Sequence, residues 1–249
     1  MKTEFIKINK IKTFKDWEKY AAPKGEAKQW VKGRSAWCMA EFAINQNDKF
    51  NGVITEILKD CGIEIQDFNC EPEATAGLGK GMKIGGPRNH DLLMVGAKNC
   101  VIGVECKVSE TFDHNFEDVY KKQGDNDNTR AFALKEFLTP GKNVDEIGKI
   151  GYQLFTATRG AMVSAMKAGY RNAIMLIIVF VGEITLNKGE TPKSYDTVIK
   201  KNDEDFCKFL NSIGANGQGM IQRKIDGKEI QCWVKKIKIS IPDYKIIKE

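Results

Sequence analysis

The stretch GGPRNHDLLMVGAKNCVIGVECKVSETF, residues 85–112, decides the fold that we expect for this chain. It contains two apolar runs, residues 92–95 and 100–108, whose composition is typical of β-strands. The residues between them, Gly96 to Asn99, are of the kind that form turns. The stretch therefore predicts a β-hairpin.

The register of this hairpin follows from the length of its loop. If residues 97–99 form a three-residue loop, Gly96 pairs with Cys100 and Asp91 pairs with Glu105. Directly opposed residues of an antiparallel pair share a face, with Cβ atoms about 5 Å apart. A slip of one residue would move every side chain to the other face. In the favoured register two carboxylates face each other across the hairpin.

Outward from the hairpin, the chain alternates between predicted helices and strands. Ser35 is a good N-cap for a helix whose apolar stripe runs over residues 36–43. The further elements that we expect are a helix at 50–58, a strand at 63–68, a long amphipathic helix at 144–168, a buried strand at 173–181, and a helix and late strand within 206–241. This order predicts an α/β fold on a central mixed sheet flanked by helices.

The chain is expected to form a single domain over residues 1–249, because no long linker or repeat divides it. Within it we expect a core at about 30–181, an N-terminal helical extension at 1–29 and a C-terminal α+β addition at 182–249. The longest apolar run, residues 173–181, is too short to span a membrane as a helix, and no targeting segment is recognisable. We therefore expect a cytoplasmic protein.

Composition excludes several classes of protein. Hydrophobic residues make up 42% and charged residues 29% of the chain, which is unlike a disordered or collagen-like sequence. The net charge of +6 permits a polyanionic partner without requiring one. The seven cysteines include no CxxC pair and only two histidines occur, so neither a disulfide framework nor a zinc site is expected.

The glycine-rich stretch AGLGKGMKIGG, residues 76–86, fits neither GxxxxGK[ST] nor GxGxxG. A flexible connection is the better interpretation. The lysines at 80, 83, 121 and 122 could follow a nucleic-acid backbone or simply solubilise the protein.

Three charges are predicted to gather on one face of the hairpin. Glu105 and Lys107 are two residues apart on a strand and therefore share a face, with Asp91 opposite. Two facing carboxylates repel each other unless a cation lies between them. Their oxygens, with the carbonyl of Cys106, would suit Mg²⁺ or Mn²⁺. Lys107 would orient a water or stabilise negative charge. The alternative is an ordinary ion pair on a half-exposed strand.

The order Asp91, then Glu105-Cys106-Lys107 on the next strand, resembles the signature of the PD-(D/E)XK nuclease superfamily. The usual proline–aspartate pair is broken, since Pro87 lies four residues before Asp91. The resemblance covers about residues 30–181 and implies a restriction-endonuclease-like core of order αβββαβ. It also implies Mg²⁺- or Mn²⁺-dependent hydrolysis of phosphodiesters.

Two more positions match features of this superfamily. Glu41, with Glu56 as runner-up, would be the acid of the first core helix, and Gln153 the polar residue of the helix after the hairpin. The chain is also similar to a bacterial group in the superfamily that shares GRSA, a VExKV-x-E-x-F strand end and a YQL-x-x-x-T helix. A defence or restriction role is implied by this resemblance alone. Glu41 could equally be a solvated helix position, and Gln153 a surface residue.

Five other residues could contact substrate or support the site. Their ordinary roles would be helix capping for Arg34 and Ser35, and a turn for Arg88, His90 and Glu110.

The leading hypothesis is a metal-dependent nuclease that acts on DNA rather than RNA, as a possible homodimer. The resemblance gives metal binding to Asp91 and Glu105, water orientation to Lys107, and support to Gln153 and Glu41. An inactive nucleic-acid-binding or protein-interaction module on the same fold is the alternative. A third and weaker hypothesis is an enzyme that acts on a small molecule and uses the glycine-rich stretch.

Overall fold

A computed structural model describes residues 1–7, 10–22, 30, 32–79, 88–124, 129–182 and 192–241. Most of the glycine-rich stretch, together with Lys80 and Lys83, lies outside the described residues.

One mixed sheet of eight strands runs through the described chain, in the order β2-β1-β3-β4-β5-β6-β8-β7. Strands β3, β4 and β5 form an antiparallel meander, whereas β5, β6 and β8 are parallel neighbours. The α/β fold with a central mixed sheet is thereby confirmed. The strands are β1 (Thr3–Ile6), β2 (Lys10–Ile11), β3 (Phe68–Ala76), β4 (Arg88–Gly96), β5 (Cys100–Lys107), β6 (Asn172–Gly182), β7 (Met220–Ile225) and β8 (Lys228–Ile241).

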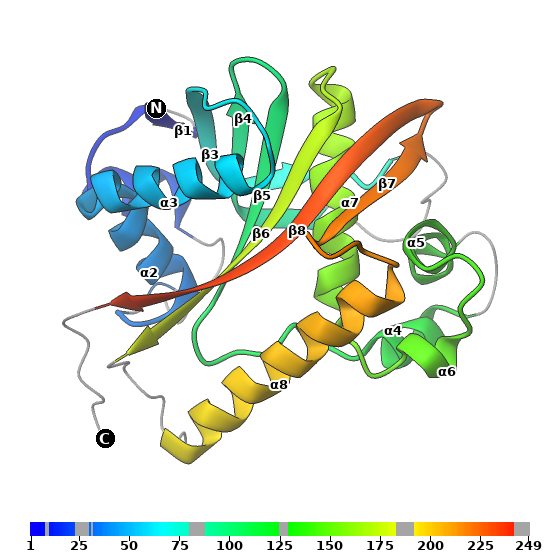
Figure 1. Cartoon of the computed structure of the whole chain (residues 1–249). Helices are drawn as coiled ribbons and strands as arrows, with labels where there is room; N and C mark the ends of the chain where they lie inside the picture. Colours follow the sequence, from blue (N-terminus) through cyan, green and yellow to red (C-terminus); the bar gives the residue numbers. More distant parts are fainter. Residues whose placement is uncertain are drawn as a thin grey trace.

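Helices cover both faces of this sheet. Figure 1 shows α2 and α3 on one face and α7 on the other. No helix in the described ranges is long and apolar enough to cross a membrane. The helices are α1 (Phe14–Ala21), α2 (Ser35–Ala40), the π-helix η1 (Glu41–Asn45), α3 (Asn47–Asp60), α4 (Phe116–Gln123), α5 (Arg130–Leu138), α6 (Val144–Ile147), α7 (Tyr152–Lys167) and α8 (Pro192–Ser212).

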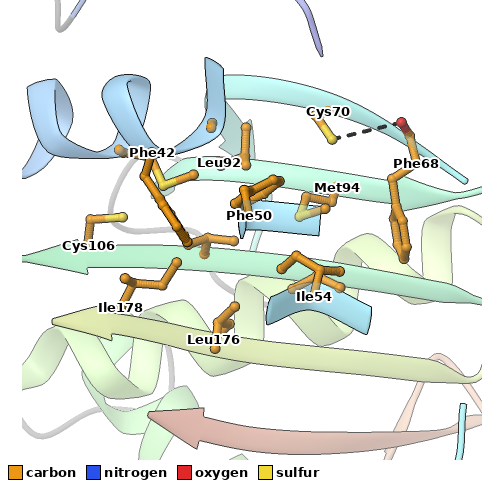
Figure 2. Close-up of a cluster of buried hydrophobic side chains, with 14 of the residues drawn as sticks. Phe42, Phe50, Ile54, Phe68, Cys70, Leu92, Met94, Cys106, Leu176 and Ile178 are labelled. Carbon is orange, nitrogen blue, oxygen red and sulfur yellow. Dashed lines mark hydrogen bonds between the residues drawn. The ribbon is translucent and has the colours of Figure 1, made fainter. Parts of the chain in front are cut away.

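The core on the α2–α3 face is built from aromatic and aliphatic side chains. Phe42 of η1 packs edge-to-face on Phe50 of α3, with ring centroids 5.5 Å apart. Beneath them lie strand residues such as Leu92, Leu176 and Ile178 (Figure 2). Burying one such aliphatic side chain contributes about 1.5–3 kcal/mol. All eight residues of β5 are buried because helices cover both of its faces, which explains its continuous apolar composition.

The β4–β5 hairpin has the predicted register. The paired residues run from Leu92–Val104 to Val95–Val101, and residues 97–99 form the loop. The ladder ends at Leu92–Val104, one residue before Asp91 and Glu105, so the predicted pairing of these two carboxylates stays a prediction.

The predicted strand at 63–68 is wrong, because the strand begins at Phe68 and continues to Ala76. Pro72 lies inside this strand and lacks an N–H for the ladder, which makes such a segment hard to recognise. The expected extension at 1–29 is not wholly helical either. Its strand β1 pairs with β3 and carries the sheet outward.

The predicted helix at 144–168 is two helices, α6 and α7, interrupted at residues 148–151. Gly151 lies against Phe112, so close that a Cβ there would come within 2.4 Å of the Phe112 Cβ. The carbonyl of Ile150 accepts the N–H of Phe116 instead of continuing a helix. This tertiary contact ends α6 and sets where α7 begins. Ser35 is likewise the first residue of α2, and the N-cap is Arg34.

Candidate active site

Strands β4 and β5 separate just beyond the regular part of their hairpin. Their backbone ladder ends at Leu92–Val104. In its place the Oδ2 atom of Asp91 accepts the N–H of Cys106 at 2.6 Å. The side chain of Asp91 therefore bridges the two strands at the point where backbone pairing stops.

The side chains of β4 change face at this same point. Leu92 and Met94 lie in the core beside α3. On a regular strand Arg88 and His90 would share that face. Instead Arg88 contacts Thr156 of α7, and His90 lies against Gly160 of α7. The alternation therefore shifts by one residue at Asp91, as in a β-bulge, a feature often found next to active sites.

The neighbouring strand β3 changes face beside it. Phe68 and Cys70 lie in the core on the α3 side, whereas Ala76 lies beside Gly160 of α7. Between them Glu73 has a φ of 48°, a left-handed conformation that is uncommon for a residue with a Cβ. The β3–β4 pairs on either side place Glu73 opposite Asp91. Such strain clusters at functional sites, where surrounding structure maintains it.

The carboxylate of Glu105 is buried among three donors. It makes ion pairs with Arg88 and with the Nζ atom of Lys107, the latter at 3.0 Å. The amide of Gln153, on the first turn of α7, donates to its Oε1 atom. Burying this carboxylate is possible because two cations and an amide replace its water.

Lys107 is 5% exposed and lies on the same face of β5 as Glu105. Burial lowers the pKa of Lys107, and the negative charges of Glu110 and Asp91 oppose that shift. The Nζ atom also lies 5.9 Å from the ring centroid of Phe112. The ammonium is thus held in a fixed place between carboxylates of the site.

These side chains open into one pocket of about 390 Å³. It is lined by strand residues, by the first turn of α2 and by the start of α7: Arg34, Ser35, Ala36, Glu73, Asp91, Glu105, Cys106, Lys107, Glu110 and Gln153. Eight of the predicted site residues therefore meet at one place, although they come from four separate segments of the chain.

Burial raises the pKa of two carboxylates in this pocket. Burial raises the pKa of Asp91, although Lys107 and the N–H of Cys106 lower it. Burial and the neighbouring Asp91 raise the pKa of Glu73 to about 8. A pKa is raised in this way when a buried carboxylate has too few positive charges or hydrogen-bond donors near it to stabilise its negative charge.

The opposite wall of the pocket is held by Glu110 and Arg34. The Oε2 atom of Glu110 accepts the N–H groups of Val108 and Ser109, at 3.2 and 2.9 Å. The Nη1 atom of Arg34 donates to Ser109 Oγ at 2.7 Å. These bonds fix the chain directly after β5, and both side chains line the pocket.

Four of the candidate residues lie apart from the pocket lining. Glu41 accepts a hydrogen bond from Asn45 within its own helix, and the runner-up Glu56 pairs with Lys59 on α3. His90 is fully buried between Gly103 and Gly160, away from the pocket lining. Burial and the charge of Arg88 hold the pKa of His90 well below its usual value. Arg88 itself supports the site through its pair with Glu105.

Sequence reasoning missed Glu73. The predicted strand ended at residue 68, so this carboxylate was not placed in the sheet. A usable signal was present in the alternation of residues 68–76, which reads FNCEPEATA. With that segment paired to β4, Glu73 falls beside Asp91.

The donor set of the pocket consists of hard oxygen atoms. Asp91, Glu73 and Glu105 supply carboxylates, and the Oε1 atom of Gln153 is buried without a hydrogen-bond partner among the described residues. Oxygen ligands of this kind fit Mg²⁺ or Mn²⁺ rather than a soft metal. In the described part of the chain, no group of three or more His, Cys, Asp or Glu side chains is already arranged to hold a metal ion.

Fold and site together define an α/β protein with a charged pocket where two strands of a mixed sheet diverge. Residues 10–240 match a family described as "Domain of unknown function (DUF6946)", and the chain belongs to this family. No curated protein and no solved structure matches the chain.

Proposed function

We propose that this protein is a metal-dependent phosphodiester hydrolase, a nuclease that acts on DNA. The observation that supports it most is the meeting of Asp91, Glu105 and Lys107 in one pocket where β4 and β5 separate. The order α3, β3, β4, β5, α7, β6, with helices α4 to α6 inserted before α7, is compatible with the αβββαβ core implied by the resemblance to PD-(D/E)XK nucleases.

Each residue then has a role that its surroundings support. Asp91 and Glu105, with Glu73 as a further carboxylate and the carbonyl of Cys106, would hold Mg²⁺ or Mn²⁺. When bound, such an ion polarises a phosphoryl oxygen and lowers the pKa of water. Few protein ligands suffice, because Mg²⁺ commonly keeps several waters and takes phosphate oxygens from its substrate.

Lys107 would stabilise negative charge that develops on the phosphodiester, or orient the attacking water. Its Nζ atom lies 3.0 Å from the Glu105 carboxylate, and the residue is buried. Gln153 would orient Glu105, since its amide already donates to that carboxylate. Arg88 would hold the second oxygen of Glu105.

The competing proposal is a binding module without activity. It is favoured by one observation: both oxygens of Glu105 are already taken by Arg88, Lys107 and Gln153. A buried ion-pair cluster that has only a structural role would show the same arrangement around Glu105.

A cleavage assay separates the two proposals. Plasmid, linear and single-stranded DNA, and RNA, would be incubated with the protein and Mg²⁺ or Mn²⁺, with EDTA as the metal control. Cleavage should require metal. Lys107→Ala should reduce it about 100-fold or more, as loss of one charge-stabilising donor does.

The control is Lys142→Ala, a lysine that lies outside the pocket and pairs with Glu146 on α6. It should cleave like the wild type. If the wild type cleaves none of the four substrates while it binds nucleic acid without metal, the hydrolase proposal is wrong and the binding module stands.

A further inference from the structure

A second polar hollow lies at the opposite edge of the sheet from the candidate active site. Strands β5, β6 and β8 are parallel, so their first residues lie at one edge, whereas Lys107 ends β5 at the other. Two adjoining hollows at the first edge measure about 540 and 520 Å³, within the usual range of ligand pockets. We call them together the edge pocket. The two hollows share Gly169, Tyr170, Arg171 and Glu229, and the rest of the lining comes from the hairpin turn before β5, from strands β6, β7 and β8 and from the turn between β7 and β8.

A row of amide side chains crosses the floor of the edge pocket. Gln222 of β7 pairs with Gln231 of β8, and Gln231 pairs with Asn172 of β6. Because they are register partners, these three side chains share a face of the sheet. Each amide offers both donors and an acceptor, so the row can bind the polar edges of a base or a sugar.

The rim of the edge pocket is positively charged. Arg171, Lys224 and Lys228 are exposed and form no ion pair with any residue in the described ranges. Lys98 adds a fourth cation, which pairs with Glu64. Glu229 is the single carboxylate in the lining. This excess of cations favours an anionic ligand, and arginine is well suited to phosphate.

Backbone constraints hold the edge pocket in shape before any ligand arrives. Ile225 pairs with Lys228 around a two-residue turn, whose residues Asp226 and Gly227 have φ angles of 47° and 80°. Two positive φ angles are typical of a type I′ hairpin turn. On the other side, the hydroxyl of Tyr170 donates to the carbonyl of Gly96 at 2.8 Å. A preformed pocket loses less entropy when it binds.

We propose that the edge pocket binds a phosphate-bearing polar ligand of nucleotide size, with phosphate at Arg171 and the base or sugar on the amide row. The ligand would be either a free nucleotide or the phosphorylated end of a nucleic-acid strand. This site is separate from the pocket at Asp91 and does not depend on hydrolysis there.

The test is calorimetric titration of the whole protein at low ionic strength, where exposed charges are least screened. The probes are AMP, CMP, adenosine, citrate, and a DNA hexanucleotide with or without a 5′-phosphate. AMP or CMP should bind and adenosine should not. Arg171→Gln should weaken binding about tenfold or more, since a hydrogen bond between charged groups is lost. Gln231→Leu should weaken the binding of nucleotides as well.

Lys142→Gln is the control, because Lys142 is an exposed lysine that pairs with Glu146 on α6. It should leave binding unchanged. Binding of the 5′-phosphorylated hexanucleotide alone would support the site and assign it to strand ends. The proposal is overturned if no phosphorylated probe binds saturably, if citrate binds as well as the nucleotides, or if Arg171→Gln binds like the wild type.

Discussion

The two halves of the β4–β5 hairpin contrast within a few residues. Near the turn, Leu92 to Val95 pair with Val101 to Val104 in an unbroken ladder of apolar residues. Beyond Leu92 the ladder stops and the strands carry Asp91, Glu105 and Lys107. The difference shows what charges require in a sheet that is buried on both faces. The backbone hydrogen bonds between β4 and β5 end at this point, and each charged side chain has a polar partner.

The charged half should be the more sensitive to loss of a single side chain. Glu105→Ala leaves Arg88 and Lys107 buried without their shared carboxylate. Removing one partner of a buried ion pair destabilises a protein by about 3–5 kcal/mol. In the regular half, Ile102→Val should cost only about 0.5–1.5 kcal/mol. Urea unfolding measures both values, and equal losses in the two variants would contradict the contrast.

The next effect concerns the face change of β4. A Cβ added at Gly160 would lie 2.8 Å from the Nε2 atom of His90, so Gly160→Ala should destabilise by about 1–3 kcal/mol. The same substitution in a His90→Ala background should lose most of that penalty. Gly52→Ala on α3 is the control, since nothing lies within 4 Å of its added Cβ. It should stabilise by about 0.5–1 kcal/mol. If Gly160→Ala destabilises the protein equally with and without His90→Ala, the ring of His90 does not lie against Gly160 and the prediction is wrong.

A third effect should appear in the pH dependence of stability. The pKa of Glu73 is raised to about 8, so the folded protein holds this proton more tightly than the unfolded chain. The stability that it contributes is complete below about pH 4.5 and is lost as the pH rises through 8. In EDTA, the wild type should therefore lose more stability than Glu73→Gln over this interval.

Thermal unfolding at several pH values measures this difference, since 1 kcal/mol corresponds to about 2–4 °C in a protein of this size. Glu71→Gln is the control two residues away on β3, because Glu71 is half exposed and pairs with Lys7. If the melting temperatures of the wild type and Glu73→Gln change equally with pH, the pKa of Glu73 is not raised in the folded protein.

The smallest effect is expected at the hairpin turn. Lys98 and Glu64 are 50% and 63% exposed, and an exposed ion pair contributes about 0–1 kcal/mol. Lys98→Ala should therefore change the free energy of unfolding by less than about 1 kcal/mol. A larger loss in urea unfolding would mean that the regular half also depends on its charges.

The sequence predicted the regular half well because its information is local. Alternation and turn chemistry around Gly96 predicted the pairing of residues 92–95 with residues 101–104, which the structure confirms. The other half depends on contacts between segments far apart in the chain. The face change at Asp91 needs β3 alongside, and the buried place of His90 needs the two glycines, Gly103 and Gly160.

The start of α7 shows the same limit. Helical periodicity continued through residues 144–168, and nothing local revealed the contact of Gly151 with Phe112. Gln153 was nevertheless placed correctly, because it lies on the first turn of α7 and its amide reaches Glu105. Glu73 could not be placed while its strand was expected five residues too early in the chain.

The most direct test of the central claim is metal binding at Asp91. Titration of the protein with Mn²⁺, followed by electron paramagnetic resonance, counts bound ions without requiring a substrate. The wild type should bind Mn²⁺, Asp91→Asn should lose that binding, and Glu71→Gln should retain it. Equal Mn²⁺ binding by the wild type and Asp91→Asn, or none by the wild type, would contradict a metal-dependent site in this pocket.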